Sequence, residues 1–259
     1  MRLSIAYDFL PKQRTLRTSL VMDHFGVGFD QGQHVIAKDV EINVKPGQVV
    51  FFTGPSGSGK SSLLRAVAQH LHQTQGENAV LWLDRLTLPE KPLVDALSVD
   101  VKDSLDLLSA CGLSEAQLLL RTPAELSDGQ RYRFRLALGI ALLEQQQTEP
   151  KGWLVADEFS AALDRTLART VAYNLRRLAT RRKIGFLLAT THEDVYEDLS
   201  PDVLVQCDLD GKIDIGYASQ QRRAVSFFPP AGSAPAPRPT GRTSLAGTTA
   251  ATTSASSKK

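Results

Sequence analysis

Residues 54–61 read GPSGSGKS, which fits the pattern G-x-x-x-x-G-K-[ST]. In this pattern the glycines let backbone N–H groups converge on phosphate oxygens, the lysine reaches the β- and γ-phosphates, and the final hydroxyl can bind Mg²⁺. The stretch follows VVFFTG (49–54), a short apolar run typical of a buried parallel strand, and it opens SSLLRAVAQHLH (61–72), which has helical spacing. Anion binding at a helix N-terminus requires this setting. The sequence therefore predicts a phosphate site around Lys60 and Ser61.

Strand-like and helical stretches alternate on both sides of this loop. The strand-like stretches are VIAKDVEINV (35–44), AVLWLD (79–84), GWLVAD (152–157), IGFLLATT (184–191) and VLVQCDLDGKIDIG (203–216), the last being two strands around a two-residue turn at Asp210-Gly211. The residues from Leu93 to Glu149 are mostly helical in pattern, and AALDRTLARTVAYNLRRLA (161–179) is a long amphipathic helix. Strands separated by helices predict an α/β fold with a mainly parallel, helix-covered sheet.

An acidic pair follows the apolar strand that ends at residue 157. Asp157 and Glu158 would lie at the carboxyl end of this strand, where ligands bind in open α/β sheets. Asp157 would orient Mg²⁺, and Glu158 would be the general base that takes a proton from the attacking water. His192, just past the next apolar strand, could donate a hydrogen bond to a γ-phosphate. The alternatives are two exposed acids at a strand end and an ordinary surface histidine.

The composition changes near residue 224. Hydrophobic residues make up 42% of the 259 residues, enough for a sizeable core. From Ala224 the chain is rich in Pro, Ala, Ser, Thr and Gly and has no acidic residue, so it cannot bury enough apolar surface to offset its ordering entropy. The whole chain carries +2 and this tail +4, which leaves the body at −2. We expect a folded domain at 1–223, with a helical insertion at about 85–145, and a disordered tail at 224–259 that is either solvated or a tether for an acidic partner.

Other features of the sequence limit the cellular compartment and the possible binding partners. Cys111 and Cys207 match no metal or redox spacing, and the N-terminus lacks the apolar run of a signal peptide. No stretch approaches the ~18 apolar residues of a membrane-spanning helix. These features predict a cytoplasmic protein. Two basic clusters, at 131–135 and 176–183, fit a solvated or helix-capping role better than a nucleic-acid surface.

Two further motifs complete a set of five. Residues 126–130 read LSDGQ and precede a helical stretch. With the phosphate loop, LVADE (154–158), SAALD (160–164) and His192 in this order, the sequence from about Phe25 to Gly216 resembles the ATP-binding-cassette (ABC) ATPase family. LSDGQ is similar to that family's signature motif, usually written LSGGQ, whose serine and glycine amides bind the γ-phosphate of ATP held by a second subunit.

The resemblance implies a P-loop NTPase core with an N-terminal antiparallel β portion and a small helical insertion. It implies a homodimer that binds and hydrolyses Mg-ATP as a nucleotide sandwich, with Lys60, Glu158 and His192 as catalytic residues and Ser61 and Asp157 as the residues at the metal. It also implies an adenine-stacking aromatic upstream of the loop, for which Phe29 is the first candidate and Phe25 the second. The nucleotide-binding residues that it implies are Gly54, Pro55, Ser56, Gly57, Ser58, Gly59, Lys60, Ser61, Ser62, Phe29, Ser127, Gly129, Gln130 and Asp164.

The sequence also departs from the family. Asp128 replaces the second glycine of the signature, and we expect its side chain to point away from the nucleotide because the Ser127 and Gly129 positions are kept. The family's glutamine loop should follow AVLWLD, yet the next glutamine is Gln117. Because that loop normally touches a membrane partner, we expect a soluble stand-alone ATPase that acts on protein or nucleic acid. The alternatives are the ATP-binding subunit of a transporter with a separate permease chain, and a regulatory module that holds ATP without turnover.

Overall fold

The structure is a computed structural model that describes residues 1–8, 10–27, 32–146 and 149–218. The tail predicted at 224–259 lies outside the described residues, so its boundary stays a prediction. In the described ranges, no helix is both long enough and apolar enough to cross a membrane.

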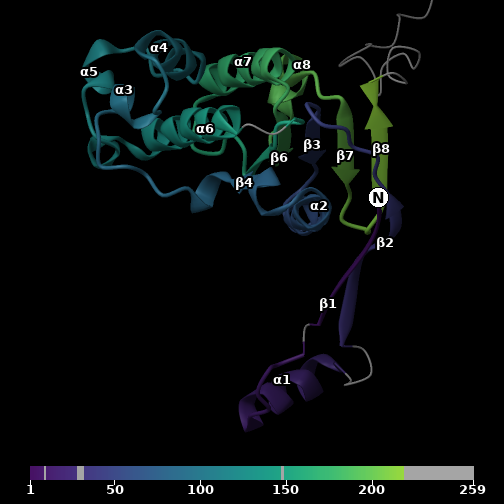
Figure 1. The fold of residues 1–259 in the computed structure, drawn as a ribbon. Helices are drawn as coiled ribbons and strands as arrows, with labels where there is room; N and C mark the ends of the chain where they lie inside the picture. Colours follow the sequence, from purple (N-terminus) through teal and green to yellow (C-terminus); the bar gives the residue numbers. More distant parts are fainter. Residues whose placement is uncertain (9, 28–31, 147–148, 219–259) are drawn as a thin grey trace, which may run out of the picture. The chain divides into compact units, whose positions relative to one another are not determined.

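Six strands form the main sheet, in the order β4-β5-β6-β3-β7-β8 (Figure 1). Neighbours from β4 to β7 pair in parallel, and β8 pairs antiparallel to β7. The strands are β3 (Val49–Thr53), β4 (Val80–Trp82), β5 (Trp153–Ala156), β6 (Gly185–Ala189), β7 (Val203–Cys207) and β8 (Ile213–Tyr217). Every residue of β3, β5 and β6 is buried, as their continuous apolar sequences predict for parallel strands covered on both faces. The predicted α/β fold is confirmed.

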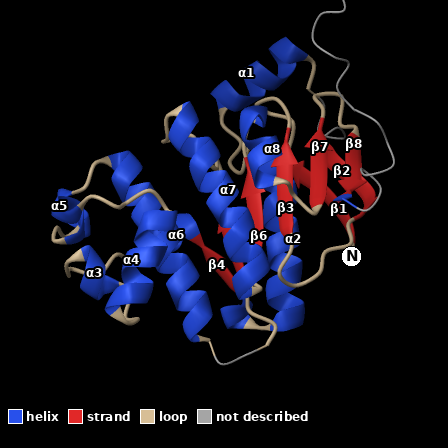
Figure 2. Ribbon diagram, turned by 90° about the horizontal axis from the view of Figure 1, so that it is seen from above, coloured by secondary structure: helices blue, strands red, loops and turns tan. Residues whose placement is uncertain are grey.

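The two faces of the sheet pack against different helices. Successive side chains of a strand point to opposite faces. Phe51 therefore joins the core cluster that contains residues of α6 (Asp128–Gln145) and α7 (Arg165–Arg182), whereas Phe52 joins the cluster that contains residues of α2 (Lys60–Gln75). Figures 1 and 2 show α2 on one side of the strands and α6 and α7 on the other. Both cores thus hold the strand that leads into the phosphate loop.

The N-terminal residues form the predicted antiparallel β portion. β1 (Arg2–Asp8) pairs antiparallel with β2 (Gln33–Glu41) and is joined to it through α1 (Leu16–Phe25). α1 begins with a capping box between Thr15 and Thr18 and ends at Gly26, which adopts a left-handed conformation. The strand predicted at 35–44 overlaps β2, whereas β1 and α1 were not predicted from the sequence.

Short helices fill most of the connection between β4 and β5. They are the 3₁₀ turn Leu83–Arg85, α3 (Leu93–Ala96), α4 (Val101–Ala110), α5 (Ala116–Leu119) and the 3₁₀ turn Pro123–Glu125, and they lead into α6. α8 (Tyr196–Leu199) follows β6. The predicted helical character of the residues from Leu93 onward agrees with this path.

Two local predictions were wrong. The β7–β8 connection is longer than a two-residue turn, because Asp208 N–H donates to Lys212 O at 2.9 Å and encloses three residues. α7 begins at Arg165 rather than at 161, because Asp164 caps it by accepting from Leu167 N–H at 2.9 Å. Residues 158–163 instead form a turn, in which Ser160 has a φ of +67°.

Candidate functional site

A pocket lies at the carboxyl ends of three adjacent strands. Its lining includes Asp157 after β5 and Thr190 after β6, together with residues of the phosphate loop that follows β3. From the loop and the start of α2 it includes Ser56, Gly57, Gly59, Lys60, Ser61 and Ser62. Because the carboxyl ends of parallel strands meet at one edge, motifs that are about a hundred residues apart in sequence line the same pocket.

The loop has the backbone conformation that phosphate binding needs. Gly54, Gly57 and Gly59 all have positive φ, at +135°, +84° and +89°. A Cβ on Gly54 would lie 2.0 Å from the carbonyl oxygen of Cys207, so only glycine fits there. No side chain caps the N-terminus of α2 at Gly59. The first N–H groups of that helix have no acceptor within the helix, so they can donate to an anion.

Lys60 projects from the first turn of α2 into this loop. Its side chain is buried, and its Nζ donates to the carbonyl oxygen of Pro55 at 2.6 Å. Burial lowers the pKa of Lys60, while the nearby Cys207 and Asp157 act to raise it. Among the described residues, Pro55 O is the one acceptor of a hydrogen bond from this ammonium group, and a phosphate oxygen can replace it.

Ser61 and Asp157 meet across the pocket. The Ser61 hydroxyl donates to Asp157 Oδ1 at 2.8 Å, and the guanidinium of Arg65 lies 3.3 Å from Asp157 Oδ2. A hydroxyl and a carboxylate are oxygen ligands, the kind that Mg²⁺ prefers. Arg65 was not predicted from the sequence, although it lies on α2 one turn after Ser61, where an i+4 residue shares the same helix face.

Glu158 follows Asp157 and lines the same pocket. Its side chain is exposed, and its φ is +56°, an unusual value for a residue with a side chain. His192 is not part of the pocket lining. It is exposed, and its backbone N–H donates to Thr190 Oγ1 at 3.1 Å, whereas Thr190 and Thr191 do line the pocket.

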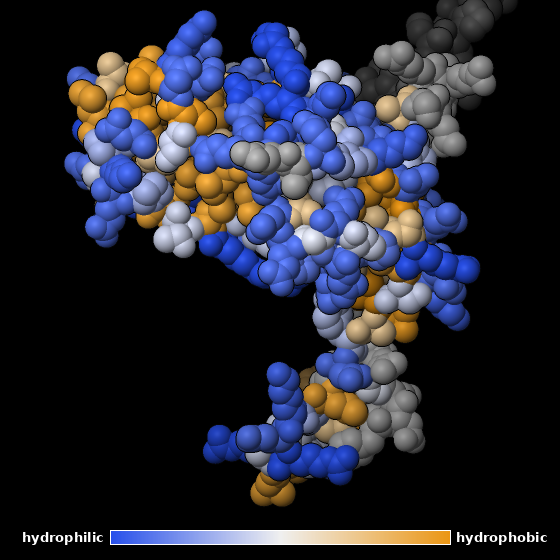
Figure 3. Space-filling view, in the orientation of Figure 1, coloured by the Kyte–Doolittle hydropathy of each residue, from blue (hydrophilic) through white to orange (hydrophobic). Residues whose placement is uncertain are grey.

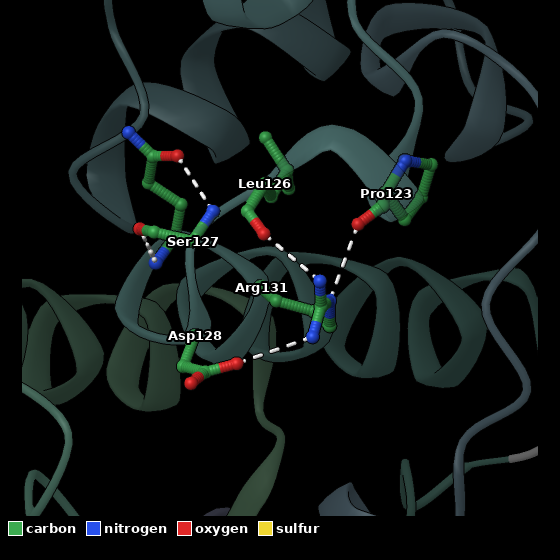
Figure 4. Close-up of polar contacts among 6 residues, drawn as sticks. Pro123, Leu126, Ser127, Asp128 and Arg131 are labelled. Carbon is green, nitrogen blue, oxygen red and sulfur yellow. Dashed lines mark hydrogen bonds and ion pairs between the residues drawn. The ribbon is translucent and has the colours of Figure 1, made fainter.

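The LSDGQ motif forms the N-terminus of α6 (Figure 4). Ser127 and Gln130 make a capping box: Ser127 Oγ accepts from Gln130 N–H at 3.4 Å, and Gln130 Oε1 accepts from Ser127 N–H at 3.0 Å. Because the hydroxyl only accepts in this contact, its own proton is free to donate to a ligand. The Asp128 side chain is 96% exposed and pairs with Arg131, which also donates to Leu126 O and Pro123 O.

The signature residues are separate from the pocket of their own chain. Ser127, Gly129 and Gln130 are not in its lining. Gly129 packs on the loop that precedes α7, where an added Cβ would lie 2.9 Å from Ala162 O. Asp164 is the N-cap of α7 and does not line the pocket either. The α6 N-terminus is therefore not part of the pocket that its own chain's phosphate loop lines.

Only one of the two predicted adenine-stacking residues can be placed, and that residue, Phe25, is not in the pocket lining. Phe29 lies outside the described residues, and Phe25 is exposed at the end of α1. Tyr7 of β1 lines the pocket instead and is 46% exposed. The alternation in RLSIAYD (2–8) was the available signal for β1, but nothing local indicated that its tyrosine would reach the phosphate loop.

The sequence of this chain is similar to those of known proteins. The profile of the family described as "ABC transporter" matches residues 37–98. The chain is 32% identical over 209 residues to the aliphatic sulfonates import ATP-binding protein SsuB 1 of Rhodococcus jostii (strain RHA1), covering 74% of this chain and 81% of that protein. It is 26% identical over 225 residues to the sulfate/thiosulfate import ATP-binding protein CysA of Escherichia coli (strain K12), covering 73% of this chain and 58% of that protein.

Solved structures show the same fold at lower identity. The structure of cbiO1 from Clostridium perfringens superposes with a TM-score of 0.55 at 19% identity, covering 76% of this chain and 87% of that one. The dimeric bacterial ABC transporter cassette MJ0796 superposes with a TM-score of 0.53 at 18% identity, covering 72% and 92%. The fold, the order of the motifs and the similarity to SsuB 1 lead to one conclusion: the chain belongs to the family of ABC transporter ATP-binding proteins and is an ATPase.

Proposed function

We propose that this chain is the ATP-binding subunit of a membrane importer and drives a separate permease chain from the cytoplasmic face. The main support for this proposal is the 32% identity to SsuB 1, an import ATP-binding protein, in an alignment that covers 81% of SsuB 1. A soluble stand-alone ATPase was the first prediction from the sequence, but the named relatives support the alternative, the transporter subunit.

The surface offers a place for a partner chain. Val101 and Leu105 are four residues apart on α4, so they share a helix face, and both are exposed, as is Leu120 after α5. Figure 3 shows apolar side chains gathered over the part of the molecule that carries α4 and α5. Exposed apolar patches of this kind mark protein–protein contacts. They suit a permease that docks on the helical segment between β4 and α6.

ATP would bind with its triphosphate on the loop at 54–61. Backbone N–H groups of the loop and Lys60 would hold the β- and γ-phosphates, with Ser62 at the edge of the pocket. Mg²⁺, which would neutralise charge on the phosphate oxygens, would be held by Ser61 and Asp157. Glu158 would accept the proton of the attacking water, and His192 would reach the γ-phosphate after a small movement of the residues past β6.

Two copies of the chain would form a sandwich around two ATP molecules. Ser127 and Gly129 of one copy would bind the γ-phosphate held by the loop of the other, because the α6 N-terminus is free of its own pocket and presents a hydroxyl proton and first-turn N–H groups. The Asp128 carboxylate pairs with Arg131 and would point away from the incoming phosphate, so that Ser127 and Gly129 can approach it.

Tyr7 is the adenine-stacking residue in this proposal. Stacking of a base on an aromatic ring contributes about 1–3 kcal/mol. We expect Tyr7→Ala to raise the KM for ATP roughly tenfold, since about 1.4 kcal/mol corresponds to a factor of ten, with little change in kcat. Tyr7→Phe, which keeps the ring, should behave like wild type. Steady-state ATPase assays test this, and equal KM values for the alanine variant and wild type would exclude Tyr7 from the adenine site.

Capture of the native complex tests the importer proposal. The full chain is affinity-purified from detergent-solubilised membranes of its own host, and co-purified proteins are identified by mass spectrometry. We expect a polytopic permease in stoichiometric amount, and its loss in the variant Val101→Asp/Leu105→Asp. Leu209→Asp, at a 71% exposed position in the β7–β8 connection, is the matched control. A chain recovered without a membrane protein would overturn the proposal.

One observation favours the stand-alone alternative. The segment after β4 contains the 3₁₀ turn Leu83–Arg85 and no glutamine between residues 76 and 116, so the residue that normally contacts the permease is missing. If the chain is a stand-alone ATPase, the captured partner would be a soluble protein or a nucleic acid, and the purified chain would reach its full ATPase rate without membranes.

A further inference from the structure

We propose that Tyr132 of α6 is a positioning residue that holds the turn bearing Glu158 in its hydrolysis-competent conformation. The inference rests on the role of Glu158 as general base given in the proposed function, and it adds a residue that no motif identifies. It depends on three features of the turn at 158–163: its unusual backbone, its few attachments, and the contact with α6.

The turn has an unusual backbone. Glu158 and Ser160 both have positive φ, at +56° and +67°, although neither is a glycine. Residues in such conformations persist only where the surrounding structure holds them. Within the turn, Ala161 N–H donates to Glu158 O at 3.1 Å and Leu163 N–H donates to Ser160 O at 3.0 Å. The position of the Glu158 carboxylate therefore depends on what anchors the next two residues.

Two backbone contacts anchor those residues to the rest of the domain. Phe159 has a fully buried side chain, and its N–H donates to Ala189 O at the end of β6 at 2.6 Å. Ser160 is also fully buried, and its N–H donates to the hydroxyl of Tyr132 at 3.4 Å. The Ser160 hydroxyl has no hydrogen-bond partner among the described residues, so it adds no contact that anchors the turn.

α6 is well placed to fix the turn. Gly129 and Tyr132 are three residues apart and share a helix face, and both contact the turn: Gly129 approaches Ala162 O, and Tyr132 reaches Ser160 N–H. The aromatic ring of Tyr132 packs against the main hydrophobic core. Burial raises the pKa of Tyr132, so it stays a neutral phenol whose oxygen can accept a hydrogen bond at any ordinary pH.

Tyr132→Phe tests this contact alone. The ring still packs, but the Ser160 N–H is left buried without an acceptor, so the turn should sample other conformations. Small misplacement of a catalytic group is costly, and we expect kcat to fall about tenfold while KM and the affinity for a fluorescent ATP analogue stay within about twofold. Tyr173→Phe, the same chemical change at an exposed position of α7, should leave all these values unchanged.

A double-mutant comparison shows whether Tyr132 acts through Glu158. Once Glu158→Gln has removed the base, adding Tyr132→Phe should lower the residual rate by less than about twofold, because residues that act as a unit are not additive. An unchanged kcat in Tyr132→Phe would overturn the inference. So would a full tenfold loss in the Glu158→Gln background, or a loss of ATP affinity together with a lower Tm.

The role of Tyr132 and the importer proposal can fail independently of each other. If no permease is captured but Tyr132→Phe lowers kcat as expected, the importer proposal fails and the role of Tyr132 stands. If a permease is captured and the kcat of Tyr132→Phe equals that of wild type, only the role of Tyr132 fails.

Discussion

Replacing Lys60 by alanine should weaken ATP binding by about a hundredfold or more and bring hydrolysis to the background level. Truncating one partner of a buried charge contact costs roughly 2–5 kcal/mol, and about 2.7 kcal/mol is a hundredfold in affinity. Lys60 is buried beside the loop with its Nζ on Pro55 O, so no other described lysine can supply the lost charge at this point. The backbone N–H groups of the loop would remain, but they hold the phosphates without a full positive charge.

Binding of a fluorescent ATP analogue measures this effect directly, and a phosphate-release assay measures hydrolysis. Lys60→Arg is an informative second variant, because it keeps the charge but replaces a compact ammonium by a planar guanidinium that does not fit the same space. Lys102→Ala, at an exposed position of α4, is the control. Near wild-type affinity in Lys60→Ala, with the control unchanged, would show that the triphosphate binds elsewhere.

The parts of the site that were predictable are those that depend on a few adjacent residues. GPSGSGKS between a buried strand and a helix is a local pattern, and the conformations of Gly54, Gly57 and Gly59 follow from it. The buried strands β3, β5 and β6 were predictable because short continuous apolar runs are typical of parallel strands that are buried on both faces. Asp157 and Glu158 were placed by their position at the end of such a run, and the structure puts both in the pocket lining.

The parts that were missed depend on contacts across the fold. Tyr7 reaches the pocket because β1 pairs with β2, although α1 separates these two strands in the sequence. Pairing between strands that are distant in sequence leaves no local pattern from which it could be predicted. Arg65 and Tyr132 are unremarkable on their own helices, and their contacts with Asp157 and Ser160 exist only in the folded chain. The start of α7 was misplaced because Ala161 and Ala162 favour helix locally, whereas the tertiary anchoring of the turn overrides that preference.

Replacing Glu158 by glutamine should separate ATP binding from turnover. The amide has nearly the same size as the carboxylate but cannot accept the proton of the attacking water, so hydrolysis should fall by about 10²–10⁴-fold. ATP should still bind, because Lys60, Ser61 and Asp157 are untouched. With its γ-phosphate intact, the nucleotide would bridge to Ser127 and Gly129 of the second copy. The variant should therefore accumulate as an ATP-bound dimer, whereas the wild type returns to monomers after each turnover.

Adding Ser127→Arg to Glu158→Gln should undo that dimer while leaving ATP binding intact. The new side chain would lie where the γ-phosphate of the partner's ATP must approach. Ser127 is not in the lining of its own chain's nucleotide pocket, so ATP binding to that pocket should not change. The substitution also removes the N-cap of α6, which costs about 1 kcal/mol, so the melting temperature must be measured alongside. Size-exclusion chromatography with Mg-ATP reports the dimer, and the fluorescent analogue reports binding. If Glu158→Gln stays monomeric at every ATP concentration, or if Ser127→Arg leaves its dimer unchanged, then LSDGQ does no more than cap α6, since its capping box already accounts for Ser127 and Gln130 within one chain.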